Sequence, residues 1–306
     1  MSTAVVEPEV GGLPGEPRAN SGGAARKNRD RLTWGLCGLA FLLIVSPAIS
    51  ILISVFHQAA PDFSLSMFTK TTADTSGLSN AILGTLLLLL GVLIVAGTIG
   101  VAAGIWLAEF APPRLGGVLR FLSEVLSGSP SIVIGYVGYV ALVTSFHWGY
   151  GLLPAVLALS TLVLPYVVKT TEVAMRQVPS ALREASEALG LFRATAVARI
   201  ILPPAIPGIV SGLIIALAIS TGETAPLLFT ANFSNNNPTF HLFHHSLGYL
   251  TAVTFNDISQ PNTPGHNYAA QGAAAAAVTL VILIVLIALG RVVSARSRRA
   301  TARMSL

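Results

Sequence analysis

Residues 184–190 read Glu-Ala-Ser-Glu-Ala-Leu-Gly, and residues 200–203 read Ile-Ile-Leu-Pro. This polar stretch interrupts apolar segments that are long enough to cross a membrane. Two interpretations are open from the residues alone. The stretch is either an ordinary loop between two membrane helices or a surface by which a separate motor protein moves the membrane part.

The composition is that of a polytopic membrane protein. Of 306 residues, 53% are hydrophobic and only 10% are charged, whereas about 25% are charged in soluble proteins. The net charge is +5, but the basic residues flank apolar runs as orientation signals do, which indicates membrane lipid and excludes nucleic acid as a partner. The single cysteine, Cys37, lies in the first apolar run, so an internal disulfide is excluded.

Six apolar segments predict an all-α membrane fold with six transmembrane helices. The fourth begins after a glycine- and aromatic-rich break at 147–151. Gly100 and Gly104 form a GxxxG pair in the second span, which predicts a close approach of another helix. The expected spans lie at about 32–56, 78–108, 125–146, 152–168, 207–221 and 273–289.

Charge predicts the orientation of these spans. Every Lys and Arg except Lys70 lies in the tails or in the loops at 109–124 and 169–203. Since Lys and Arg are enriched in cytoplasmic loops, both termini and the polar stretch are expected to be cytoplasmic. The expected regions are a disordered cytoplasmic tail (1–30), a first transmembrane helix with its outer loop (31–74), a main transmembrane domain (75–295) and a basic cytoplasmic tail (296–306).

Within the polar stretch, residues 179–190 predict a short amphipathic helix. Pro179 and Ser180 favour a helix start. Gly190 is suited to a left-handed C-cap. A second helical piece is expected at about 193–201, ending at Pro203 and Pro204.

The stretch resembles the EAA motif of prokaryotic ABC-importer permeases, which reads E-A-A, three residues, G, nine residues, I-x-L-P. Only the third position departs, with Ser for Ala. The resemblance, over about 75–295, implies a type I importer permease in which the helix at about 179–190 is the coupling helix that docks on an ATP-binding subunit. The residues carrying this expected role are Glu184, Ala185, Ser186, Gly190, Ile200, Leu202 and Pro203.

A second motif lies at the end of the fifth span. Residues 222–230 read Gly-Glu-Thr-Ala-Pro-Leu-Leu-Phe-Thr. An ionisable residue such as Glu223 within a membrane domain usually faces a bundle interior or a pathway. A solvated carboxylate at the outer interface is the alternative.

Residues 222–230 and 128–135 resemble stretches of the PstA-type subfamily of phosphate-importer permeases. The resemblance implies phosphate as the transported ion, with sulfate and molybdate as alternatives. Some relatives carry a basic residue just before the first stretch, where this chain has Ala-Ile-Ser-Thr at 218–221. The expected pathway residues are Ser129, Pro130, Ser131, Thr221, Glu223, Thr224, Glu172 and Arg176.

Two of these pathway residues have a simpler interpretation. Glu172 and Arg176 are spaced i, i+4 and pair on a helix surface without any functional role.

Three histidines in the outer loop, within Phe240-His241-Leu242-Phe243-His244-His245, have metal-like spacing. They lack acidic or cysteine neighbours, so a surface or re-entrant segment, or a contact with an extracytoplasmic binding protein, is preferred.

The sequence predicts no enzymatic site. It contains no Walker A loop, no HExxH and no paired cysteines. The resemblance therefore implies that ATP and magnesium are bound by a separate ATPase dimer, and that the chain itself holds no cofactor. It further implies a homologous second permease, an extracytoplasmic phosphate-binding protein and a place in the prokaryotic plasma membrane. A secondary transporter without an ATPase, or a membrane scaffold, are the alternatives from other classes.

Overall fold

The computed structural model describes residues 23–61, 63–74 and 77–304, with side chains over 27–295. Most of the expected N-terminal tail, residues 1–22, lies outside the described residues. The described chain divides into two compact units, one ending at Ile53 and the other beginning at Ser54.

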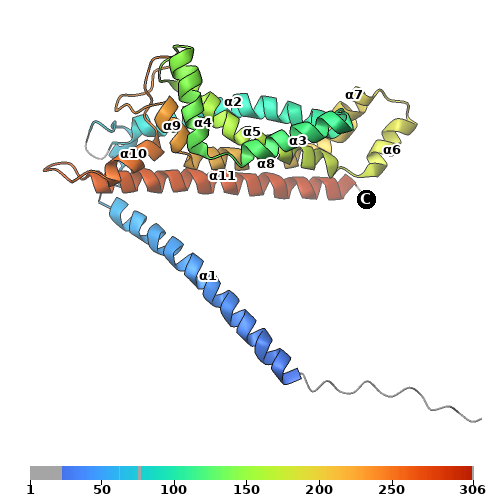
Figure 1. Cartoon of the computed structure of the whole chain (residues 1–306), viewed down its shortest axis with the longest axis horizontal. Coiled ribbons are helices and arrows are strands. Elements are labelled where there is room, and N and C mark those ends of the chain that lie inside the picture. Colours follow the sequence, from blue (N-terminus) through green and yellow to red (C-terminus); the bar gives the residue numbers. More distant parts are fainter. Residues whose placement is uncertain (1–22, 62, 75–76, 305–306) are drawn as a thin grey trace, which may run out of the picture. The chain divides into compact units, whose positions relative to one another are not determined.

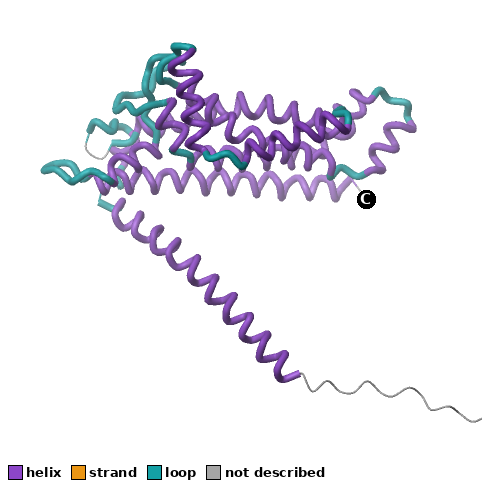
Figure 2. Tube along the Cα trace, in the orientation of Figure 1, coloured by secondary structure: helices purple, strands orange, loops and turns teal. Residues whose placement is uncertain are grey.

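The described elements are all helical. The first half contains α1 Gly23–Ala59, η1 Leu65–Phe68, α2 Ser79–Glu109, α3 Pro113–Ser127, α4 Ser131–Gly138, η2 Tyr139–Ser145 and α5 Leu152–Arg176. The second half contains α6 Ser180–Ala188, α7 Arg193–Ala196, η3 Val197–Ile201, α8 Leu202–Gly222, α9 Ala225–Thr230, α10 Leu250–Ile258 and α11 Tyr268–Met304. Figure 2 shows helices joined by loops throughout the drawn chain.

Five helical segments are long and apolar enough to cross a membrane, namely α1, α2, α5, the run from α7 to α8, and α11. The bent pair formed by α3 and α4–η2 supplies a sixth if it counts as one span. The all-helical membrane fold is thereby confirmed. Helix α1 begins at Gly23, before the expected start of the first span, because the Ala, Arg and Lys residues ahead of the apolar run are good helix formers.

The second unit is built on α2, α5, α8 and α11, which run side by side in Figure 1. Leu88 and Val92 of α2 pack with Leu159 and Val163 of α5 in the largest buried cluster. The predicted close approach at the GxxxG pair is confirmed, because a Cβ at Gly104 would lie 2.5 Å from the Thr171 Cβ of α5. This close packing leaves the ends of α2 and α5 next to each other.

The third span, expected at about 125–146, is bent near its start. Helices α3 and α4–η2 meet at 97°. Pro130 lies in an extended conformation and has no N–H to continue α3. The Ser129 hydroxyl donates to the Val125 carbonyl oxygen (3.1 Å) and so closes the end of α3.

The fifth span also differs, since the expected helix end at Pro203 and Pro204 is wrong. Helical structure continues from Arg193 through Gly222. Pro203 lies in the first turn of α8, where a missing N–H is tolerated. The preceding turn, η3, is π-helical, which accommodates the interrupted hydrogen-bond ladder.

Candidate functional site

Helix α6 forms the short amphipathic helix predicted for the polar stretch. Gly190 follows it with φ of +66°. The Gly190 N–H donates to the Glu187 carbonyl oxygen (2.9 Å) and the Leu191 N–H to that of Ser186 (3.3 Å), which is the Schellman pattern of a helix C-terminus. The predicted left-handed C-cap is confirmed.

One face of α6 is open and the other is held against the bundle. Glu184 and Ala185 are exposed, and Leu189 is 74% exposed. Ser186 is buried, and its hydroxyl donates to the Arg183 carbonyl oxygen (2.7 Å). The Ser that departs from the EAA pattern therefore lies on the inner face of α6.

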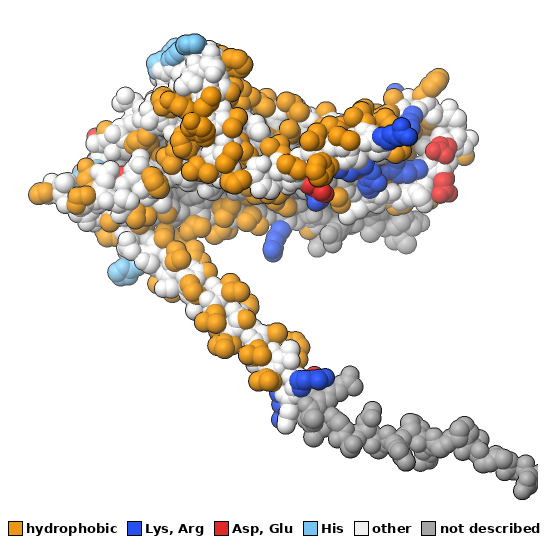
Figure 3. Space-filling view, viewed as in Figure 1, with side chains coloured by type: hydrophobic (Ala, Val, Ile, Leu, Met, Phe, Trp, Pro, Cys, Tyr) orange, Lys and Arg blue, Asp and Glu red, His pale blue; other side chains and the backbone are white. Residues whose placement is uncertain are grey.

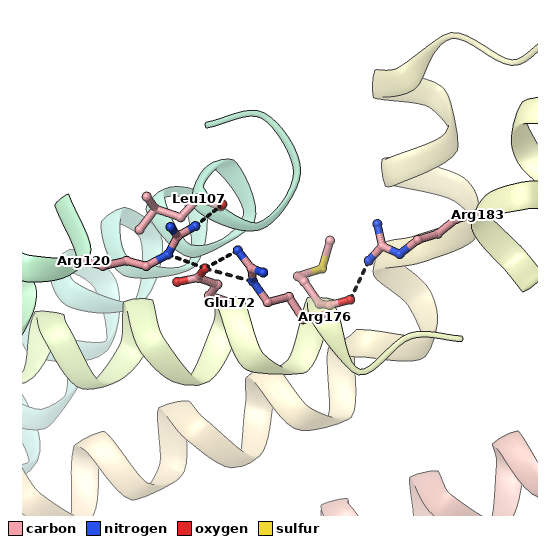
Figure 4. Close-up of polar contacts among 6 residues, drawn as sticks. Leu107, Arg120, Glu172, Arg176 and Arg183 are labelled. Atoms are coloured by element: carbon pink, nitrogen blue, oxygen red, sulfur yellow. Dashed lines mark hydrogen bonds and ion pairs between the residues drawn. The ribbon is translucent and has the colours of Figure 1, made fainter. Parts of the chain in front are cut away.

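Arg183 joins α6 to two other helices. Its Nη1 donates to Glu109 Oε2 at the end of α2 (2.7 Å), and its Nη2 donates to the Met175 carbonyl oxygen in the last turn of α5 (2.8 Å; Figure 4). The Glu109 side chain is 4% exposed. The contact between Arg183 and Glu109 was not predicted, and the only signal for it in the sequence is a lone Glu at the end of an apolar run.

Glu172 gathers two arginines on the same side of the bundle. Its Oε1 accepts from Arg120 Nε of α3 (2.7 Å) and from Arg176 Nε of its own helix (3.0 Å; Figure 4). The predicted Glu172–Arg176 pair is confirmed, whereas Arg120 was not foreseen. Figure 3 shows Lys and Arg side chains gathered at the α6 end of this unit.

The structure brings the other two predicted stretches together, because α4 packs against α9. A Cβ at Gly135 would lie 2.6 Å from the Pro226 Cα, so only glycine permits this contact. The rings of Tyr136 and Phe229 meet edge to face at 6.1 Å. Residues 128–135 and 222–230 therefore form one structural feature.

The predicted polar residues at this contact differ in what they can offer. Glu223 is half-buried, and Ser131 at the start of α4 lies close to it. The Thr221 hydroxyl already donates to the Leu217 carbonyl oxygen (2.8 Å), as Ser129 does to Val125. Thr224 is the N-cap of α9 without a side-chain capping bond. In this conformation, the protons of Thr221 and Ser129 are thus committed to the backbone.

The outer histidines form no site with metal geometry. The rings of His241 and His245 stack at 4.5 Å. Within the described residues, no group of three His, Cys, Asp or Glu side chains is arranged to hold a metal ion.

Comparison with known proteins identifies the family of this chain. Residues 100–299 match the family described as the binding-protein-dependent transport system inner membrane component. The chain belongs to this family. It is therefore the membrane component of a transporter, a multi-pass inner-membrane permease.

Similar permeases extend the match over most of the chain. One from Mycobacterium bovis, named "Phosphate transport system permease protein PstA 2", is 46% identical over 238 residues, covering 78% of this chain and 79% of the relative. One from Xylella fastidiosa, named "Phosphate transport system permease protein PstA", is 36% identical and covers 62% of this chain and 67% of the relative.

A solved structure shares the fold. The inward-facing MetNI methionine ABC transporter aligns with a TM-score of 0.55 and 21% identity, covering 73% of this chain and 95% of that chain. The ABC-importer permease fold expected from the sequence is thereby confirmed.

Proposed function

We propose that this permease moves inorganic phosphate into the cell as one subunit of an ATP-driven importer. The observation that carries the proposal is the 46% identity to a phosphate transport system permease over 79% of that relative. The packing of residues 128–135 against 222–230 supports it, because these are the two stretches that resemble phosphate permeases.

In the proposed complex, the chain pairs with a homologous second permease and receives phosphate from an extracytoplasmic binding protein. ATP and magnesium are bound by two ATPase subunits. Both termini and α6 face the cytoplasm, in line with the placement of all Lys and Arg residues except Lys70. We also propose that the membrane domain extends from residue 75 to residue 295.

Helix α6 is the proposed docking surface for the ATPase. Its exposed face offers Glu184, Ala185 and Leu189 to a groove on the partner. Ser186, Gly190, Ile200, Leu202 and Pro203 shape the turn and the helix start behind that face. Movement of α6 reaches the ends of α2 and α5 through Arg183, which bonds to both.

The proposed mechanism is alternating access. Closure of the ATPase dimer moves α6, and the attached helix ends open the pathway outward; hydrolysis returns it inward. The pathway residues proposed are Ser129, Pro130, Ser131, Thr221, Glu223 and Thr224 at the α4–α9 contact, with Glu172 and Arg176 nearer the α6 end. Phosphate shifts such an equilibrium only through a difference in affinity between the two states.

Radiolabelled phosphate uptake tests the substrate. Cells whose only phosphate permease pair contains this chain should take up phosphate, with arsenate competing and sulfate and molybdate without effect. If sulfate or molybdate instead abolishes the uptake of labelled phosphate, that oxyanion takes the place of phosphate as the proposed substrate.

Co-purification tests the docking role. Glu184→Lys and Gly190→Pro should each release the ATPase from the purified complex and abolish uptake while the chain still inserts in the membrane. A complex that keeps its ATPase in both variants would remove α6 from the coupling role.

A further inference from the structure

A cavity of about 470 Å³ opens between α3 and α5 on the α6 side of the bundle. This volume lies within the range of small-molecule sites, roughly 300–1,000 Å³. Leu107, Pro165 and Val168 form part of its apolar wall. Three cationic side chains also line it, namely Arg120, Lys169 and Arg176.

The cations in this cavity are only partly neutralised. Glu172 accepts from both arginines through one oxygen, Oε1. The second acidic residue of the lining, Glu124, is exposed and therefore solvated. Lys169 and Arg176 are exposed as well, so the lining carries three positive charges and two negative ones, a net charge of +1.

Several donors in the cavity are not engaged. Arg120 uses Nε and Nη2, the latter on the Leu107 carbonyl oxygen (3.1 Å), and Arg176 uses Nε and Nη2 on Glu172. Within the described residues, Arg120 Nη1, Arg176 Nη1 and Lys169 Nζ have no hydrogen-bond partner. Glu172 holds both guanidinium groups in place, so the Nη1 donors of Arg120 and Arg176 are fixed in orientation.

We infer that this cavity binds a phosphate-type oxyanion through Arg120, Lys169 and Arg176. Charge-assisted N–H donors from guanidinium and ammonium groups are the chemistry that phosphate oxygens select. In this inference, which rests on the proposed function, the anion is the transported phosphate on its way out of the bundle. The phosphate of an anionic lipid headgroup offers the same chemistry and is the other source.

The test uses the purified transporter in lipid nanodiscs, with inorganic [33P]phosphate as the probe in equilibrium dialysis. Lys169→Gln removes one exposed cation without leaving Glu172 unpaired, so the variant is expected to fold. Phosphate binding without the binding protein should weaken about tenfold, as expected for the loss of one hydrogen bond to a charged group. Lys169→Arg should restore it. Lys70→Gln is the matched control, because it removes one exposed Lys from a loop outside the cavity.

Two nanodisc compositions distinguish the sources. With phosphatidylcholine alone and with added phosphatidylglycerol, free phosphate should bind equally and depend on Lys169 in both. If the site instead holds a lipid phosphate, wild-type transporter will retain phosphatidylglycerol through purification more than Lys169→Gln does, and inorganic phosphate will not bind.

Equal phosphate binding and equal lipid retention in the wild type and Lys169→Gln would overturn the site. Phosphate uptake by cells carrying the wild-type chain is measured separately. Failure of that uptake rejects the proposed substrate, whereas normal uptake with an unaffected Lys169→Gln variant rejects only this cavity.

Discussion

Arg183 Nη1 lies 2.7 Å from Glu109 Oε2, and this ion pair attaches α6 to the end of α2. The Glu109 side chain is 4% exposed and that of Arg183 is 29% exposed. When a buried carboxylate has one charged partner, removal of that partner strongly lowers the stability of the folded protein. Through this pair, a movement of α6 is expected to shift the end of α2, and a movement of α2 is expected to shift α6.

Arg183→Gln should destabilise the membrane domain by about 3 kcal/mol, because it leaves Glu109 charged, buried and unpaired. Phosphate uptake should fall with it. The measurement is chemical unfolding in detergent micelles, together with uptake in cells.

The double variant Glu109→Gln/Arg183→Gln is the matched control. It removes both charges, so it should be more stable than Arg183→Gln alone, with a coupling energy of about 1 kcal/mol or more. Strictly additive effects of the two substitutions would mean that the ion pair contributes nothing.

Gly190 provides a second prediction about α6. Gly190→Ala should destabilise the turn by about 1–2 kcal/mol, because its φ of +66° is unfavourable for a residue with a Cβ. Among the described residues, no atom lies within 4 Å of the Cβ position, so the effect comes from the backbone alone. Hydrogen exchange of the α6 amides measures it.

Asn tolerates the left-handed conformation better than Ala. Gly190→Asn should therefore protect the α6 amides more than Gly190→Ala does, and should retain more ATPase in pull-downs. Equal loss in both variants would show that the tolerance of a residue for the left-handed conformation does not decide at this position.

The local features of this fold could be predicted from the sequence, whereas the long-range contacts could not. The left-handed turn at Gly190 and the i, i+4 pair at Glu172 depend on neighbouring residues. Arg120 and Glu172 are 52 residues apart, and Glu109 and Arg183 are 74 apart. No periodicity relates such positions, so the partners of both buried carboxylates required the packed bundle.

The bend in the third span and the continuous helix at Pro203 have a common physical origin. Both concern proline, which ends a helix only where its missing N–H and its ring cannot be accommodated. Pro130 follows a closed helix end and produces the 97° bend. Pro203 lies in the first turn of α8, directly after the π-helical segment η3, so the helix continues.

The α2–α5 contact gives a third prediction. Gly104→Ala should destabilise the unit by about 1–3 kcal/mol, because a Cβ would lie 2.5 Å from the Thr171 Cβ and 2.7 Å from the Val168 carbonyl oxygen. Thermal unfolding of the purified chain measures this change.

Gly117 of α3 is the matched control, since it is exposed and no atom lies within 4 Å of its Cβ position. Gly117→Ala should leave stability unchanged or raise it by up to about 1 kcal/mol through helix propensity. A Gly104→Ala variant as stable as Gly117→Ala would show that α2 and α5 separate readily.

Asp257 of α10 makes the stability of the loop region between α9 and α11 depend on pH. Asp257 is 8% exposed and lies beside a polar cavity of about 330 Å³. Burial raises the pKa of Asp257 from 3.8 to about 6, and the nearby His266 opposes this rise. Among the residues that line the cavity, the other titratable side chains are His266 and Tyr268.

Between these two pKa values, the folded chain keeps a proton that the unfolded chain has lost. The contribution of Asp257 to stability is therefore fully present below pH 3.8 and is lost as the pH rises to about 6. Asp257→Asn is uncharged at every pH, so it should match the wild type near pH 4 and exceed it above about pH 6. The measurement is the melting temperature of both proteins across this range. A constant difference between them would show that Asp257 is solvated in the folded state and keeps its ordinary pKa.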